Sequence, residues 1–133
     1  MALISFSMPQ SQIKALMAEA RQIGAVLAVR GLIGGDFKQT VMKIQSLAGE
    51  ADTGMLIDPT RFRRFEVSAA PTFVLPLEPL RPCTDHACPT PVHVKATGSA
   101  TFQYFLDLVA RSGDAREKAE ATVWLAKYDI PLK

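Results

Sequence analysis

The sequence predicts an α/β fold in which helices flank a mixed β-sheet, and three observations lead to this prediction. In the first half of the chain, short apolar runs alternate with longer segments whose apolar residues recur at helical spacing. In the second half, two strand-like runs follow one another without a helical pattern between them, as in an antiparallel pair. The 133 residues, 48% hydrophobic and 21% charged, suffice for a core of their own, so we predict a single domain over residues 1–133.

The first half of the chain reads as strand, helix, strand, helix, strand. The predicted strands are residues 3–6, 26–29 and 54–57. Helical spacing predicts a helix over residues 9–22 that is closed by Gly24. A second helix, capped by Asp36 and stopped at Gly49, should turn one apolar face to the core. That face consists of Phe37, Val41, Ile44, Leu47 and Ala48.

The second half begins with a short helix. Asp58 followed by proline predicts an N-cap, and residues 60–65 should place Phe62 and Phe65 on one buried face. The later elements are a strand over 72–75, a surface insertion over 76–91, a strand over 92–96, a helix through Phe102, Phe105, Leu106 and Val109 that ends near Gly113, and a C-terminal extension over 114–133. Within this extension, a helix over 114–128 should be anchored by Val123, Trp124 and Leu125.

Charge and hydropathy exclude several classes of protein. Fifteen basic and 13 acidic residues give a net charge of +2, too balanced for a nucleic-acid-binding footprint. No apolar stretch approaches the length that spans a bilayer. The opening MALISFSMP lacks the basic start and long apolar middle of a secretory signal, so we expect nothing in this chain to direct export.

The segment 62–74 resembles the thioredoxin superfamily in its short helix, connecting residues, proline and following strand. The resemblance implies a thioredoxin-like fold with a cis bond before Pro71, and a trans proline that merely starts a strand is the alternative. Thioredoxins carry their reactive cysteines at the start of the helix after the second strand. Here that place, 31–36, holds no nucleophile, and no paired carboxylates appear elsewhere, because Asp107 stands alone on its helix. We therefore predict no catalytic residue, no cofactor and no metal.

A closer resemblance rests on four runs of residues. These are Val29-Arg30-Gly31-Leu32, Ile57-Asp58-Pro59, Phe62-Arg63-Arg64-Phe65 and Ala70-Pro71. Over about residues 3–112 the chain is similar to the C-terminal domain of TrbC, the family of pilin assembly proteins of F-type conjugative transfer systems. The resemblance implies a periplasmic protein that takes part in pilus assembly within a type IV secretion apparatus and binds the assembly protein TraW. The insertion and the tail after residue 113 depart from the family.

The two cysteines, Cys83 and Cys88, lie in the insertion together with five of the nine prolines. A disulfide that closes this small loop is the leading interpretation, and such a bridge also fits an oxidising compartment. A redox-active pair, aided by His86, is the first alternative. A zinc site that adds His86 and His93 is the second, although the spacing fits no usual zinc pattern.

The leading functional hypothesis is a non-catalytic component that binds another assembly protein. The predicted contact surface is Leu32 and Ile33, together with the backbone beside Ala70 and Pro71, which in the superfamily accepts an extended client segment. A thiol-disulfide oxidoreductase or isomerase that uses Cys83 and Cys88 is the alternative function.

Three further features have two interpretations each. The glycine-rich loop 31–35 is either a connecting turn or an anion site, although it lacks the residues of a phosphate-binding motif. The cluster Arg61, Arg63 and Arg64 is either the solvated side of a helix or a contact for an acidic partner. Trp124 and Tyr128 either pack the last helix onto the domain or anchor a partner.

Overall fold

The computed structural model describes residues 1–48, 55–84 and 88–129. Within these ranges the strands form one five-stranded sheet in the order β3-β2-β1-β4-β5. Its strands are β1 (Ala2–Ile4), β2 (Leu27–Val29), β3 (Met55–Ile57), β4 (Thr72–Pro76) and β5 (His93–Thr97). The pairs β1–β2 and β2–β3 are parallel, whereas β1–β4 and β4–β5 are antiparallel. The predicted α/β class with a mixed sheet is therefore confirmed.

The helices begin and end close to their predicted positions. They are α1 (Gln10–Ile23), the short 3-10 helix η1 (Ile33–Gly35), α2 (Phe37–Ala48), α3 (Pro59–Arg64), α4 (Phe102–Ser112), α5 (Ala115–Leu125) and the 3-10 helix η2 (Ala126–Asp129). Gly24 ends α1 in the left-handed conformation, with φ of 70°, a position that favours glycine. Asp58 caps α3 as predicted, because its side chain accepts a hydrogen bond from the Thr60 N–H. The predicted stop of α2, Gly49, lies outside the described residues.

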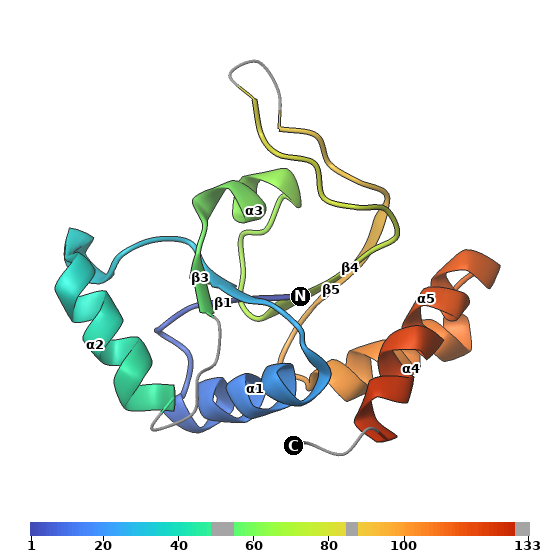
Figure 1. The fold of residues 1–133 in the computed structure, drawn as a ribbon, viewed down its shortest axis with the longest axis horizontal. Helices are drawn as coiled ribbons and strands as arrows, with labels where there is room; N and C mark the ends of the chain where they lie inside the picture. The colour runs from blue at the N-terminus through green and yellow to red at the C-terminus, as the bar shows by residue number, and fades with distance from the viewer. Residues whose placement is uncertain (49–54, 85–87, 130–133) are drawn as a thin grey trace.

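The two faces of the sheet carry separate apolar cores. One core joins α1 and α4 to the sheet, with Phe73 packed against Phe102 and Phe105. The other core lies under α3 and includes both predicted aromatic residues, Phe62 and Phe65, which are buried. Figure 1 shows α3 and the insertion on one side of the sheet and α1 on the other. None of the described helices is long and apolar enough to cross a membrane.

The apolar face predicted for α2 is only partly correct. Leu47 is buried, but Phe37, at the first residue of the helix, is 66% exposed, and Val41 and Ile44 are half-buried. Figure 1 shows that the C-terminal end of α2 approaches α1 while its first turn projects beyond the sheet. The other buried residue in the described part of α2 is polar: Thr40, at 0% exposure. The prediction that Phe37 belongs to the core is therefore wrong, because the first turn of α2 lies beyond the sheet and is not covered by it.

The last helix packs onto the molecule through residues that differ in part from the predicted anchors. Val123 is 57% exposed and is not an anchor, whereas Ala121 is fully buried. Trp124 and Tyr128 lie against the α1–α4 core, which agrees with the packing interpretation. The Tyr128 hydroxyl donates to the Glu19 carboxylate at 2.9 Å, and burial together with that carboxylate raises the pKa of Tyr128.

Candidate functional site

Three loops meet at one edge of the sheet because of the strand order. The parallel strands β1 and β2 end at the same edge, and β4, antiparallel to β1, starts there. The loop after β1, the loop after β2 and the segment before β4 are therefore neighbours, although up to about 65 residues separate them in the sequence. Because β1 lies between β2 and β4, its loop occupies the middle of this edge.

These loops enclose an open groove with a volume of about 560 Å³. Its lining residues are 4–7, 29–33 and 68–70, together with Phe62 from α3. The lining is mostly apolar and contains no cysteine, so thiol chemistry has no residue here. Three of the four residues predicted to bind a partner, Leu32, Ile33 and Ala70, come together in this groove.

Leu32 presents an apolar side chain at the groove, 38% exposed, while Ile33 is half-buried. The buried Thr40 holds this loop to α2, because its hydroxyl accepts a hydrogen bond from the Ile33 N–H and donates to the Asp36 carbonyl oxygen, both at 2.8 Å. The N–H groups of Gly35 and Asp36 also donate within the loop. An anion at this loop would lack these three donors, which disfavours the anion-binding interpretation.

The segment 68–70 offers unpaired backbone groups to the groove. The bond between Ala70 and Pro71 is cis, as the resemblance to thioredoxins implied. Pro71 itself is buried, and its carbonyl oxygen accepts a hydrogen bond from the Gly98 N–H. Among the described residues, neither the N–H nor the carbonyl oxygen of Ala70 has a hydrogen-bond partner. Ala70 therefore supplies the unpaired backbone groups at this site, whereas the buried Pro71 is paired with Gly98.

Arg30 is the one cationic side chain among the groove-lining residues. Its guanidinium lies 5.1 Å from the centroid of the Phe62 ring and donates a hydrogen bond of 2.8 Å to the Val67 carbonyl oxygen. This contact ties the loop after β2 to the chain immediately before the open segment. Arg30 thus connects two walls of the groove.

Sequence reasoning missed Ser5, Phe6 and Ser7, which form the middle wall of the groove. The hydroxyls of Ser5 and Ser7 lie 2.7 Å apart, and the Ser7 N–H donates to the Ser5 hydroxyl. No local pattern marks these residues as functional, because their position depends on β1 pairing with both β2 and β4. The strand order is the signal that would have identified them.

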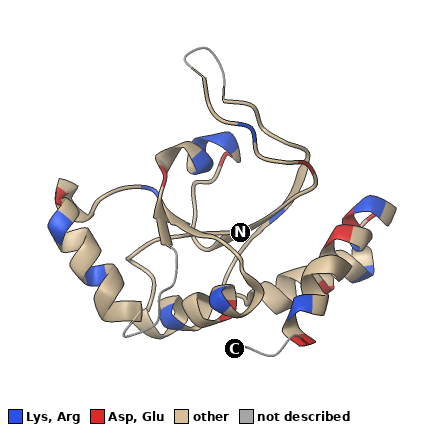
Figure 2. Ribbon diagram, in the orientation of Figure 1, with Lys and Arg blue, Asp and Glu red and all other residues tan. Residues whose placement is uncertain are grey.

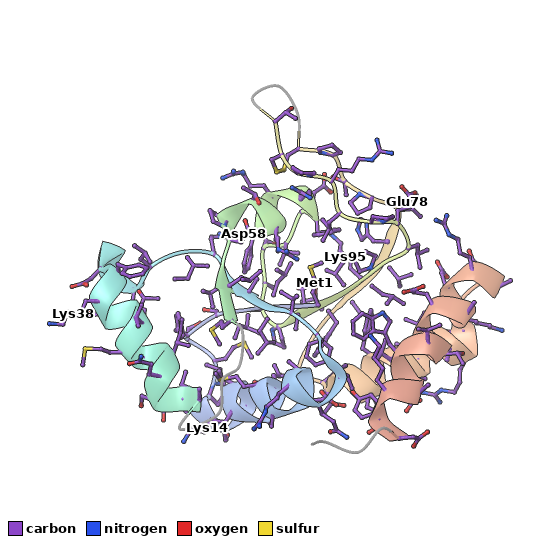
Figure 3. The ribbon with its side chains drawn as sticks, viewed as in Figure 1. Met1, Lys14, Lys38, Asp58, Glu78 and Lys95 are labelled. Atoms are coloured by element: carbon purple, nitrogen blue, oxygen red, sulfur yellow. A yellow bond between two sulfur atoms is a disulfide. The ribbon has the colours of Figure 1, made fainter. Side chains whose placement is uncertain are left out.

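Helix α3 supports the groove through Phe62 and is itself fixed at both ends. At its start, burial of the Asp58 carboxylate opposes ionisation, but hydrogen bonds from Thr60 and Arg61 outweigh burial and lower the pKa of Asp58. At its end, the Lys95 ammonium from β5 donates to the carbonyl oxygens of Phe65 and Glu66. Figure 3 labels Asp58 at α3 and Lys95 on the strand.

The insertion also rests on α3. Cys83 and Cys88 form a disulfide, which confirms that prediction. The Arg64 guanidinium contacts both sulfurs, with Nη2 2.6 Å from Cys83 Sγ and Nε 3.1 Å from Cys88 Sγ, and it donates to the Arg81 carbonyl oxygen at 2.8 Å. In return, the Thr90 hydroxyl donates to the Arg64 carbonyl oxygen.

The zinc interpretation finds no support in this geometry. Both cysteine sulfurs are used in the disulfide, and the His93 ring packs edge-on against Phe65 with 4.8 Å between centroids. His86 lies outside the described residues. Within the ranges that the structure describes, no three side chains of the metal-binding types gather in one place.

The three arginines of the basic cluster differ in their contacts. Figure 2 shows in blue the basic positions along the ribbon of α3. Arg61 forms an ion pair with Asp58 at 3.1 Å, and Arg64 holds the disulfide. Only Arg63 is exposed and without a partner among the described residues. The interpretation of a solvated helix side, expected for at least two of the three arginines, therefore fits Arg63 but not Arg61 and Arg64.

Residues 2–109 match the sequence model of a known family, described as type-F conjugative transfer system pilin assembly protein. The chain belongs to this family. Over 73 residues, or 54% of its length, the chain is 33% identical to the periplasmic protein TrbC of Escherichia coli K12. The aligned region spans 34% of the length of that relative. No solved structure matches the chain.

The family match covers some elements of the chain and leaves others outside it. The match to the pilin assembly family includes the three loops of the groove, α3, and the insertion with its disulfide. It ends within α4, so α5 and η2 lie beyond it. The groove and the disulfide therefore both lie within the matched range of residues 2–109, and α5 lies outside it.

Proposed function

We propose that this pilin assembly family member is a non-catalytic component that binds an extended segment of another pilus assembly protein in the groove. The observation that carries this proposal is the unpaired backbone of Ala70, which lies beside the exposed Leu32 in a groove without a cysteine. Main-chain groups that have no partner inside the chain can pair with an extended peptide, and the apolar walls can hold its side chains.

The proposal includes a thioredoxin-like fold. The central position of β1, flanked by a parallel β2 and an antiparallel β4, supports it. In that superfamily the backbone beside the cis-proline accepts an extended client segment. Without cysteines among its lining residues, the groove would hold such a segment without thiol exchange.

We place this function in the periplasm and take a TraW-like assembly protein as the partner. The name of the E. coli relative supports the location, and the disulfide is consistent with an oxidising compartment. The family description supports a partner within the conjugative apparatus. The Arg30 guanidinium would favour an acidic residue in the bound segment.

Co-purification tests this function. The chain, directed to the periplasm, is expressed with the other proteins of its transfer system, and the TraW-like partner is quantified in the pull-down. The double variant Leu32→Asp/Ile33→Asp should lower partner recovery by about 100-fold, because two carboxylates would lose water in an apolar contact. Thermal unfolding serves as the check that this variant still folds.

The control is Val123→Asp, which adds one carboxylate, against two in the groove variant, at an exposed apolar residue of α5. This variant should recover the partner as the unmodified chain does. Equal recovery with the groove variant and the unmodified chain contradicts the groove as the contact surface. Recovery from the cytoplasmic fraction alone contradicts the compartment.

A further inference from the structure

The disulfide of the insertion has an unusual neighbour, a guanidinium that contacts both of its sulfurs. Arg64 Nη2 lies 2.6 Å from Cys83 Sγ, and Nε lies 3.1 Å from Cys88 Sγ. The backbone at Arg81 fixes the third nitrogen, Nη1. Cys83 is exposed and Cys88 is half-buried, so an incoming molecule can reach the first sulfur while the second rests against α3.

This arrangement favours the reduced state of the pair. A disulfide sulfur is a weak, uncharged acceptor, whereas a thiolate carries a full charge beside the same guanidinium. Arg64 therefore stabilises the products of reduction more than the disulfide itself. Nearby cations also make a thiolate a better leaving group, and exposed disulfides are the readily exchanged ones.

We propose that Cys83–Cys88 is a thiol–disulfide exchange site that oxidises an exposed cysteine pair on another protein, with Arg64 stabilising the thiolates that are released. This activity belongs to the insertion and goes beyond binding in the groove, which remains non-catalytic and on which the exchange does not depend. The substrate class is a protein dithiol that can reach the exposed Cys83.

The exchange proceeds in two balanced steps. A thiolate of the dithiol attacks Cys83 Sγ, a mixed disulfide forms, and the bond to Cys88 breaks with its electron pair left on Cys88 Sγ beside Arg64 Nε. The second thiol of the substrate loses its proton to solvent. The resulting thiolate attacks the first sulfur of the substrate, which is bonded to Cys83 in the mixed disulfide. It releases Cys83 as a thiolate beside Arg64 Nη2. The substrate loses two electrons as it forms a disulfide, and the Cys83–Cys88 pair gains them.

The equilibrium with glutathione tests the role of Arg64 in the folded chain. Purified protein is equilibrated with buffers of known ratios of reduced to oxidised glutathione, and the oxidised fraction is measured by thiol alkylation and mass spectrometry. Arg64→Gln should lower the equilibrium constant for reduction by about tenfold, the loss of one charge-assisted hydrogen bond. That change corresponds to a potential about 30 mV more negative. The rate of reduction by dithiothreitol should fall by a similar factor.

Three variants distinguish a chemical role from a structural one. Arg63→Gln removes a neighbouring charge that contacts neither sulfur and should leave the equilibrium unchanged. Arg64→Lys keeps the cation and should recover part of the loss. Thr90→Val removes another contact between the insertion and α3 without altering charge, and should also leave the equilibrium unchanged. An equal change in Thr90→Val and Arg64→Gln, or no change in Arg64→Gln, overturns the proposal.

Single-cysteine variants test which sulfur is attacked. With Cys88→Ser, the remaining Cys83 thiolate should attack the disulfide of a test protein and form a mixed disulfide with it. This attack is the reverse of the second exchange step above. With Cys83→Ser, the half-buried Cys88 should react at least about tenfold more slowly, since access limits exchange. Equal rates, or no mixed disulfide with either variant, contradict Cys83 as the exchanging sulfur.

Discussion

The groove and the insertion both rest on α3, a helix of six residues, yet they differ in what they offer. Phe62 lines the groove, where apolar side chains and unpaired backbone groups lie together without a cysteine among the lining residues. Arg64, on the same helix, meets the insertion, where an exposed disulfide lies against a cation. The groove is suited to binding an extended peptide, and the insertion is suited to thiol–disulfide exchange.

This difference shows that the disulfide and the peptide-binding groove lie at separate positions but are both supported by α3. Phe65, the residue after α3, is 1% exposed, and its carbonyl oxygen accepts a hydrogen bond from Lys95. Changes at this support should disturb both sites, whereas changes in one loop should disturb one. Substitutions in α3 and in each loop distinguish these cases.

The largest effect is expected from Phe65→Ala. Removing this buried ring leaves a cavity in the α3 core and should lower the free energy of unfolding by about 3–5 kcal/mol. Partner binding and the reactivity of the disulfide should both change, because Phe62 and Arg64 lose their common support. Urea unfolding measures the first, and the pull-down and the glutathione equilibrium measure the others. Tyr104→Ala, an aromatic truncation at a 58% exposed site, should change stability by under about 0.5 kcal/mol.

A smaller and more selective effect is expected from Thr40→Val. The change removes the buried hydroxyl that holds Ile33 and leaves the Ile33 N–H unpaired, at a cost of about 1–3 kcal/mol. Partner binding should weaken while the glutathione equilibrium stays constant. Thr122→Val makes the same substitution on an exposed turn of α5 and serves as the control. A shift of the glutathione equilibrium in Thr40→Val would show that the two sites are coupled through more than α3.

The smallest effect is expected at Asp58. Loss of its N-cap in Asp58→Ala should cost about 1 kcal/mol at pH 7, and Asp58→Asn, which keeps a capping oxygen, should cost less. Since the folded-state pKa of Asp58 lies below its ordinary value, the ionised carboxylate stabilises the fold above the unfolded-state pKa of about 3.9. This stabilisation is lost as the pH falls through the folded-state pKa.

Urea unfolding between pH 2 and pH 7 measures that dependence. The difference in stability between the unmodified chain and Asp58→Asn should be constant at neutral pH and should shrink below about pH 4. A difference that grows as the pH falls would contradict the direction of the pKa shift.

Local patterns predicted most of the secondary structure because their causes are local. Gly24 ends α1 in the left-handed conformation, and Asp58 caps α3, each through contacts with residues nearby in the sequence. Apolar periodicity also identified the buried face of α4, but it placed Phe37 and Val123 wrongly. Periodicity shows which residues share a face of a helix, and it does not show whether another layer covers that face.

The candidate sites depended on contacts that no local pattern contains. Leu32 and Ala70 were predicted together only through a resemblance, and Ser5–Ser7 were missed because strand order alone brings them to the groove. Arg64 lies 19 and 24 residues from the two cysteines that it contacts, with no sequence spacing to indicate the pair. Such contacts follow from tertiary structure rather than from composition or periodicity.

Hydrogen–deuterium exchange at the groove tests the central claim most directly. The amides of Ser68, Ala69 and Ala70 have no hydrogen-bond partner among the described residues and should exchange rapidly in the isolated chain. In complex with the TraW-like partner, the Ala70 amide should become protected by at least about tenfold, because it would donate to the bound segment. Unchanged exchange at Ala70, with protection confined to the insertion or to α5, would contradict the groove as the binding site.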